Sequence, residues 1–273
     1  MIQKLYETLC HINETENVLR DEPMSRHTTF RIGGPAALFC TPRTVPQLAD
    51  TVKACVEAGV PYYILGNGSN VLVSDAGYEG VVIQLFRNMD GIRVNGTELE
   101  AEAGALLVRI AHLAAKEGLT GLEFASGIPG TLGGALVMNA GAYGGEMKDV
   151  VKEAVVLKPD GELLRLSKEE LELGYRTSII ARKGYLVVSA LLELEAGEKG
   201  TIEARMQELK EARTSKQPLE YASAGSTFKR PEGYFAGKLI MDAGLRGYAV
   251  GGAQVSEKHC GFVINRGGAT AQN

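Results

Sequence analysis

The pattern of apolar and polar residues predicts short helices and strands that alternate along the first half of the chain. Residues 44–59 carry apolar side chains at helical spacing, with Thr44 as N-cap and Gly59 as the end. The apolar runs 62–65, 71–73 and 81–85 are separated by turn residues and are typical of strands. A second amphipathic helix is expected over 105–118, where His112 lies beside the apolar face as a tolerated helix residue.

The alternation continues after a glycine-rich stretch. Residues 150–158, 163–166 and 185–195 are strand-like, and Ser167 and Glu170 have the spacing of a capping box. The charged residues 198–218 predict a solvated helix to about residue 214, followed by a linker. Together these elements indicate an α+β fold.

We predict a first domain over 1–208, with lobes of about 1–88 and 89–208, and a second over 209–273. The second domain is expected to contain a short helix over 234–244 and a strand over 262–265. Thr270 resembles the N-cap of a helix whose further residues are not in the sequence, so we expect a final element to be missing.

Composition and charge exclude several classes of protein. The net charge of −4 gives no basic footprint for nucleic acid, and no apolar run approaches the roughly 20 residues of a membrane span. The N-terminal residues are too polar for a signal peptide, which favours a cytoplasmic protein. The four cysteines are far apart, so we expect free buried thiols, and the pair His259–Cys260 falls short of a metal site or a catalytic dyad.

Gly66, Asn67, Gly68, Ser69 and Asn70 lie directly between two apolar runs. Such a turn can direct consecutive N–H groups at one point and bind an anion, although an ordinary hairpin turn explains it almost as well. A Rossmann loop has to open a helix and a P-loop requires Gly-Lys-Ser/Thr, so the strand-like residues that follow exclude both.

A second glycine-rich stretch covers residues 126–146, with glycines at 127, 130, 133, 134, 141, 144 and 145. Pro129, Gly130 and Thr131 can begin a short helix whose N-terminal amides suit a pyrophosphate, and Gly133 and Gly134 permit close backbone packing. Two such loops about sixty residues apart indicate a long cofactor held by backbone, such as a dinucleotide. Spacing alone does not identify flavin.

Two further segments carry charged or hydroxyl side chains. Tyr175, Arg176 and Ser178 stand beside strand-like residues, and a guanidinium there can hold a carboxylate or stabilise an enolate, or simply form a surface salt bridge. In the other segment, the cations Lys216, Lys229 and Arg230 lie near Ser226 and suit a diphosphate. Ser226 lacks the surroundings of a hydrolase nucleophile, which leaves hydrogen bonding or proton donation open.

In combination these motifs resemble the UDP-N-acetylenolpyruvoylglucosamine reductases, the MurB family. The matching motifs occur in the family's order from about residue 25 onwards: TTFRIGGPA, LGNGSN, SGIPGTLGGALVMNAGAYG, YRTS, KQP, AGSTFKRP and GAQVSEKHCGFVIN. The resemblance implies a two-lobed FAD-binding domain of the vanillyl-alcohol-oxidase (PCMH) type, followed by a smaller α+β substrate-binding domain. The absence of a tyrosine-bearing insertion after AGSTFKRP resembles the family's shorter subtype.

The resemblance also implies the chemistry. NADPH would reduce non-covalent FAD and leave, and UDP-N-acetylglucosamine enolpyruvate would enter the same cleft, accept the hydride and become UDP-N-acetylmuramate for peptidoglycan. Arg176 would stabilise the developing charge and Ser226 would protonate C2. The implied substrate contacts are Tyr143, Tyr175, Lys216, Arg230 and Gln254.

The implied FAD contacts are mainly backbone, and the chain is expected to be a monomer without a metal ion, nucleic acid or membrane partner. The family's C-terminal glutamate lies beyond the last residue given, so a catalytically impaired FAD-binding fragment is an alternative, as is a related flavin oxidase. The expected FAD-binding residues are Arg31, Gly33, Gly34, Gly66, Asn67, Gly68, Ser69, Asn70, Gly127, Ile128, Pro129, Gly130, Thr131, Gly133, Gly134, Asn139 and Gly141.

Overall fold

A computed structural model describes residues 1–273, and the chain forms two compact units. The first unit consists of Met1–Arg20, Leu38–Asn67 and Gly80–Lys210. The second unit consists of Asp21–Ala37, Gly68–Glu79 and Glu211–Asn273. The second unit therefore takes two of its three segments from the first 79 residues. The division into domains at residue 208 stays a prediction.

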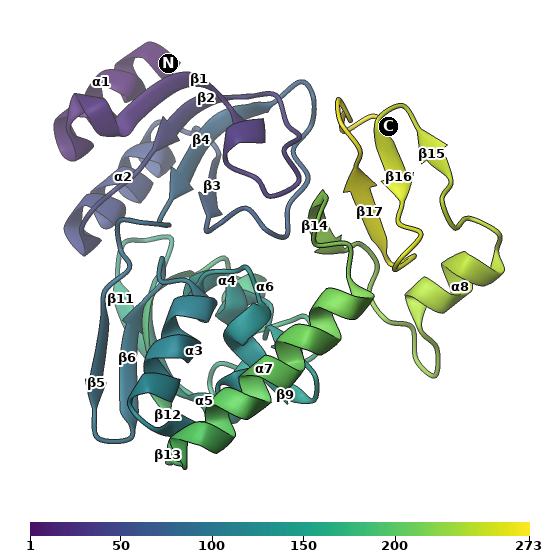
Figure 1. Cartoon of the computed structure of the whole chain (residues 1–273). Helices are drawn as coiled ribbons and strands as arrows, with labels where there is room; N and C mark the ends of the chain where they lie inside the picture. The colour runs from purple at the N-terminus through teal and green to yellow at the C-terminus, as the bar shows by residue number, and fades with distance from the viewer. The chain divides into compact units, whose positions relative to one another are not determined.

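The N-terminal part forms a four-stranded sheet in the order β1 (Val18–Pro23), β2 (Pro35–Cys40), β4 (Tyr78–Gln84) and β3 (Tyr62–Leu65), with β3 and β4 parallel. Helices α1 (Ile2–Asn13) and α2 (Val45–Glu57) lie side by side against it (Figure 1). The predicted cap of α2 is confirmed, because Thr44 Oγ1 accepts the Gln47 N–H at 3.3 Å.

The predicted strand at residues 71–73 is wrong. These residues form no ladder with another strand, and the neighbouring Ser74 carbonyl accepts the amides of Gly34 and Gly77 at 2.9 Å each. Apolar β-branched residues were therefore not sufficient for a strand where no adjacent strand supplies partners.

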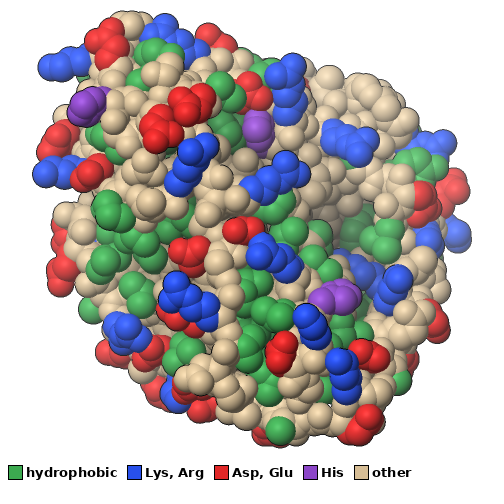
Figure 2. All heavy atoms as spheres, turned by 60° about the vertical axis from the view of Figure 1, so that its left-hand side comes forward, with side chains coloured by type: hydrophobic (Ala, Val, Ile, Leu, Met, Phe, Trp, Pro, Cys, Tyr) green, Lys and Arg blue, Asp and Glu red, His purple; other side chains and the backbone are tan.

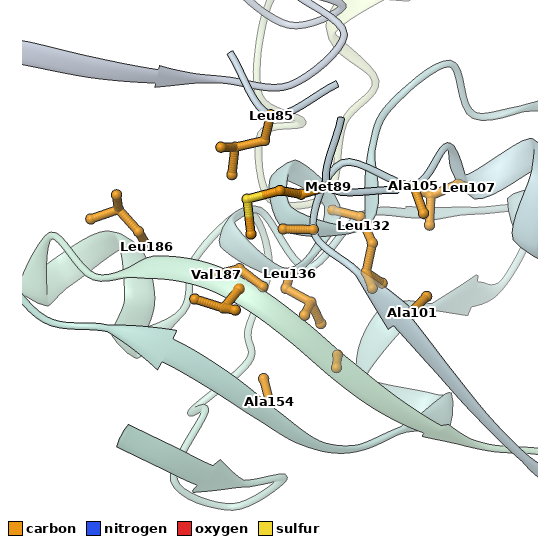
Figure 3. Close-up of a cluster of buried hydrophobic side chains, with 14 of the residues drawn as sticks. Leu85, Met89, Ala101, Ala105, Leu107, Leu132, Leu136, Ala154, Leu186 and Val187 are labelled. Atoms are coloured by element: carbon orange, nitrogen blue, oxygen red, sulfur yellow. The ribbon is translucent and has the colours of Figure 1, made fainter. Parts of the chain in front are cut away.

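A five-stranded antiparallel sheet follows in the order β11, β10, β12, β6 and β5. One face carries the helices α3 and α4, and the side chains between them form the buried cluster of Figure 3, including Met89, Leu107 and Leu132. The bounds are β5 (Ile92–Asn95), β6 (Glu98–Glu102), β10 (Val151–Leu157), β11 (Leu163–Ser167), β12 (Leu186–Glu193), α3 (Leu107–Lys116) and α4 (Leu132–Val137).

Short elements connect this sheet to its helices. The Ser167–Glu170 capping bonds form, but only turns follow them and no helix begins there. The elements are β7 (Leu119–Thr120), β8 (Gly141–Ala142), β9 (Gly145–Glu146), β13 (Glu195–Ala196), α5 (Met147–Val150), α6 (Ile179–Lys183) and the 3₁₀ turns η1 (Thr15–Asn17), η2 (Met24–Arg26) and η3 (Glu123–Gly127).

Helix α7 (Lys199–Lys216) confirms the predicted solvated helix. Ile202, Met206 and Leu209 form its buried stripe at helical spacing, and the charged residues face solvent. Acidic and basic side chains lie interspersed over the face of the molecule in Figure 2. None of the helices has the length and apolar content that a membrane crossing requires.

The C-terminal part of the second unit is a four-stranded antiparallel sheet beside a short helix. The order is β14 (Ala222–Ser226), β17 (Phe262–Asn265), β16 (Ala253–Val255) and β15 (Ala249–Val250), and the helix is α8 (Ala236–Asp242). Helix α8 has no buried residue. The helices and the largely antiparallel strands of both units confirm the predicted α+β class.

Candidate active site

The two glycine-rich loops predicted to grip a cofactor meet inside the first unit. Asn67 Nδ2 donates to the Pro129 carbonyl at 2.7 Å. A Cβ at Gly66 would overlap Thr131 Oγ1, so only glycine permits this approach. Gln84 Nε2 donates to the Gly66 carbonyl at 3.1 Å and fixes the start of the first loop. Residues about sixty positions apart therefore form one backbone surface, which supports the two-loop interpretation.

The start of α4 differs from the expectation. The amides of Leu132 and Gly133 are already bonded to the carbonyls of Ala105 and Ala103, at 2.8 and 2.9 Å. The first two amides of α4 are therefore not available to a pyrophosphate, and the backbone donors left without a backbone partner belong to Gly130, Thr131 and Gly134. Close packing at Gly133 is confirmed, because its Cβ would lie 3.1 Å from that of Ala103.

Six predicted cofactor residues lie in the second unit: Arg31, Gly33, Gly34, Gly68, Ser69 and Asn70. A Cβ at Gly34 would overlap the carbonyl oxygen of Asp75, and one at Gly68 would overlap that of His27. The Thr29 N–H donates to the Gly68 carbonyl at 3.0 Å. The segment with Arg31, Gly33 and Gly34 thus lies directly against the segment that begins with Gly68, Ser69 and Asn70.

Arg176 occupies a tight turn in the first unit. Gly174 and Thr177 exchange two backbone hydrogen bonds of 3.1 and 3.2 Å around Tyr175 and Arg176. The Arg176 guanidinium carbon lies 5.5 Å from the centroid of the Tyr175 ring. Ser178 does not stand beside a strand as expected, because it N-caps α6, where its Oγ accepts the Ala181 N–H at 3.2 Å.

Left-handed backbone marks several of these positions. Eight non-glycine residues have positive φ, and four of them are predicted site residues: Arg31 at 56°, Asn139 at 42°, Tyr143 at 52° and Arg176 at 55°. An L-residue adopts this conformation at an energetic cost that the surrounding structure has to offset, and such residues gather at functional sites. The backbone therefore marks the same positions as the motifs.

The hairpin that carries Tyr143 is organised by Asn139 and Glu146. Strands β8 and β9 pair around Tyr143 and Gly144, and a Cβ at Gly141 would crowd the Gly145 carbonyl at 2.7 Å. The Glu146 carboxylate bonds the Lys148 ammonium, and this bond raises the pKa of Lys148. Tyr143 itself is exposed.

Ser226 ends β14 in the second unit, opposite Phe262 of β17. Its Oγ lies 3.2 Å from the position that a Gly261 Cβ would take, and the His259 ring lies 2.9 Å from the same point. His259 is thus a neighbour of Ser226, which sequence reasoning missed. Gly237 and Gly261, which both leave room for its ring, were the available signal.

The predicted substrate residues of the second unit occupy separate elements. Lys216 ends α7, and Gln254 Nε2 donates to the Gly247 carbonyl at 3.0 Å. The Arg230 guanidinium carbon lies 3.9 Å from the centroid of the Phe235 ring, and its Nε donates to the Tyr234 carbonyl at 3.3 Å. These contacts hold Arg230 over its own loop.

Two protein-family models match different parts of the chain. Residues 36–167 match the FAD binding domain family. Residues 217–273 match the family described as the UDP-N-acetylenolpyruvoylglucosamine reductase, C-terminal domain.

Individual relatives match almost the whole chain. The UDP-N-acetylenolpyruvoylglucosamine reductase of Clostridium perfringens (strain SM101 / Type A) is 54% identical over 270 residues, which cover 99% of this chain and 88% of the relative. That of Clostridioides difficile (strain 630) is 53% identical over 271 residues, covering 99% and 89%.

Solved structures agree. The reductase (MurB) from Thermus caldophilus has a TM-score of 0.82 and 38% identity, covering 93% of this chain and 90% of that one. A substrate-bound p-cresol methylhydroxylase has a TM-score of 0.54 at 15% identity, covering 71% of this chain and 43% of that one, and shares the fold alone. This confirms the predicted two-lobed flavoprotein fold class.

Proposed function

Because the chain belongs to the UDP-N-acetylenolpyruvoylglucosamine reductase family, we propose that it uses FAD and NADPH to reduce UDP-N-acetylglucosamine enolpyruvate to UDP-N-acetylmuramate for peptidoglycan synthesis. The contact between Asn67 and Pro129 carries the proposal, because it joins the two glycine-rich loops within the residues that match the FAD binding domain. We further propose a cytoplasmic monomer with separate domains over 1–208 and 209–273.

The loops have the properties that a dinucleotide cofactor requires. Gly66 lets the first loop pack against Thr131 of the second, and the amides of Gly130 and Thr131 can donate to phosphate oxygens. Gly34 and Gly68 let the segments of the second unit that carry Arg31 and Ser69 pack against each other. When bound, FAD supplies the hydride that NADPH has given it. The residues of the chain bind and orient the cofactor and the substrate, stabilise the developing charge and donate a proton.

Arg176 is proposed to bind the substrate carboxylate. A guanidinium keeps its positive charge throughout the physiological pH range, and its fork matches a carboxylate. Negative charge grows on that carboxylate when hydride reaches the neighbouring double bond, so the same contact strengthens in the transition state. The two backbone hydrogen bonds between Gly174 and Thr177 limit how far Arg176 can move.

Ser226 is proposed to give its Oγ proton to C2 of the substrate. A serine hydroxyl is a weak acid, so this transfer requires an acceptor of high proton affinity, such as a carbon that carries enolate charge. Ser226 lies at the end of β14, beside Gly261, so pairing within the sheet fixes the backbone that carries the hydroxyl. Lys216, Tyr143, Tyr175, Arg230 and Gln254 are proposed substrate contacts.

The proposal is tested on the purified full chain. We expect a yellow protein whose flavin NADPH reduces and the enolpyruvyl UDP-sugar reoxidises. Ser226→Ala should keep the first half-reaction and slow the second by about 10²–10⁴-fold, and Arg176→Ala should slow the second by about 10²–10³-fold. Rapid reoxidation by oxygen instead of the UDP-sugar would indicate a flavin oxidase.

Matched variants control for general damage. Ser223 lies on the same strand as Ser226, and Arg165 is an exposed arginine paired with Glu153, so neither Ser223→Ala nor Arg165→Ala should change either half-reaction. A colourless protein, or normal turnover by Ser226→Ala, would contradict the proposal.

A further inference from the structure

Asn139 is the most deeply buried polar residue of the glycine-rich stretch. Its side chain is 1% exposed, and its backbone has a positive φ of 42°. It follows α4 directly and precedes the hairpin β8–β9. A buried amide requires partners for its two donors and its acceptor, because an unpaired buried donor costs about 1–3 kcal/mol.

The hydrogen bonds of Asn139 use all its donors. Nδ2 donates to Glu146 Oε2 at 2.8 Å and to the Gly174 carbonyl at 3.2 Å, and its backbone N–H donates to the Leu136 carbonyl at 3.3 Å. Oδ1 accepts the Lys148 N–H at 2.9 Å. A phosphate or a flavin carbonyl would require a donor, and Asn139 has none left. Its side chain therefore binds the protein itself.

The bond to Gly174 reaches the turn that presents Arg176. The Gly174 carbonyl also accepts the Thr177 N–H, so Asn139 supports one end of that turn. At the other end, the fully buried Ser178 donates through Oγ to the Val137 carbonyl at 2.8 Å. Residues 137 and 139 thus hold both flanks of the Tyr175–Arg176 turn.

Arg176 requires such support. Its left-handed φ of 55° costs on the order of 1–3 kcal/mol in an L-residue, and it persists only where neighbouring bonds impose it. The turn's two internal bonds fix its shape, but they do not fix its place on the unit. Asn139 supplies that link from the glycine-rich stretch.

We propose that Asn139 is a positioning residue for Arg176 and that its side chain does not bind the cofactor. The inference rests on the role of Arg176 given above under the proposed function. The buried side-chain amide of Asn139 therefore links the glycine-rich stretch, expected to bind FAD, to the Gly174–Thr177 turn, expected to bind the substrate carboxylate. A small misplacement of Arg176 slows the step in which its charge is needed.

The test separates the bond to Gly174 from the bond to Glu146. Asn139→Asp removes both Nδ2 donors, keeps an acceptor for the Lys148 N–H and places a second carboxylate beside Glu146. Adding Glu146→Gln provides an amide that can donate to the introduced carboxylate, which restores the link within the hairpin. The bond to the Gly174 carbonyl stays absent.

We expect the double variant N139D/E146Q to retain FAD and normal flavin reduction by NADPH, and to reoxidise with the enolpyruvyl UDP-sugar about tenfold or more slowly. In an Arg176→Ala background the same pair of substitutions should change that rate less than about twofold, because Asn139 acts only through Arg176. Asn88→Asp, which loses a bond to the Thr41 carbonyl elsewhere in the first unit, should change neither half-reaction.

Three outcomes would overturn the inference. They are normal reoxidation by the double variant, loss of FAD from it, and an undiminished effect of the pair in the Arg176→Ala background. If Arg176→Ala itself leaves reoxidation unchanged, the proposed role of Arg176 fails first, and the inference about Asn139 fails with it.

Discussion

The two units are stabilised in different ways. In the first, one continuous cluster of buried apolar side chains joins α1, α2, α3 and both sheets. In the second, α8 buries no residue, and Tyr234, Phe235 and Tyr248 are each about 60% exposed. The first unit therefore has one large hydrophobic core, whereas the second buries fewer apolar side chains, such as Met24, Ile32 and Ile264, and derives less stability from apolar burial.

Hydrogen bonds between distant segments hold the second unit instead. Thr29 Oγ1 donates to the Ser223 carbonyl at 2.7 Å, and Asn265 Nδ2 donates to the Phe30 carbonyl at 3.1 Å. The Asp75 carboxylate accepts the N–H groups of Ala271 and Gln272 at 2.8 and 3.0 Å. Each such bond contributes only about 1 kcal/mol, so the unit depends on having several. Four predictions test this contrast.

The largest difference is expected from leucine truncation. Leu107→Ala, at a fully buried position of α3, should lower the free energy of unfolding by about 2–5 kcal/mol. Leu239→Ala, on α8 and 43% exposed, should cost less than about 1 kcal/mol. Urea unfolding followed by circular dichroism measures both. Equal losses of unfolding free energy in the two variants would contradict the difference between the units.

Close backbone approach should matter more at Gly34 of the second unit than at Gly134 of the first. Gly34→Ala introduces a Cβ that overlaps the Asp75 carbonyl, and we expect a loss of about 1–3 kcal/mol. Gly134→Ala meets only Thr131 Oγ1, at 3.7 Å, and lies in a helix, so it should be neutral or stabilising. Thermal unfolding of both variants checks this pair. If Gly34→Ala leaves the unfolding temperature unchanged, the backbone around Asp75 can shift to make room for the added Cβ, and this prediction fails.

Thiol labelling can follow the units separately. Cys40 and Cys55 are buried in the core of the first unit, and Cys260 is buried in the second. Cys10 is only partly buried and labels early, and in low urea we expect Cys260 to react before Cys40 and Cys55, since a unit with fewer apolar contacts opens more easily. Peptide mapping after timed alkylation identifies the labelled site. Labelling of Cys40 or Cys55 before Cys260 would reverse the comparison.

An alkaline loss of stability is expected in the first unit. Burial raises the pKa of the Cys40 and Cys55 thiols from an ordinary value of 9.0 to about 12 in each case. The folded state keeps these protons while the unfolded state releases them, so this stability is complete below pH 9 and is lost between pH 9 and 12. Urea midpoints of Cys55→Ala should therefore fall less steeply over this range than those of the unaltered chain. Parallel slopes would contradict the assignment.

The sequence predicted the elements whose periodicity reflects burial. The helix capped by Thr44 was confirmed because its cap and apolar stripe are local, and the strands at 62–65 and 262–265 were confirmed because adjacent strands pair with them. The strand at 71–73 was wrong because strand formation depends on a neighbour that local sequence does not reveal. The capping box at Ser167 likewise formed without a helix.

The site was predictable in its residue types and less so in its geometry. Glycine indicates where backbone approaches closely, and Gly66 fulfilled that expectation. Arginine has no preference for left-handed backbone, so the φ of Arg31 and Arg176 could not be predicted from their identity. Nor could the sequence reveal that carbonyls of Ala103 and Ala105 would occupy the first amides of α4.

The interleaved order of the units has a consequence for synthesis on the ribosome. All segments of the first unit have been made by Lys210, whereas residues 21–37 and 68–79 of the second wait for the segment that begins at Glu211. Chains fold as they emerge, from the N-terminus onwards. The first unit can therefore complete its core while the two early segments of the second still lack the C-terminal segment with which they pack. During that interval the Phe30 carbonyl and the Asp75 carboxylate, which later accept hydrogen bonds from Asn265 and from Ala271 and Gln272, are open to chaperones and proteases.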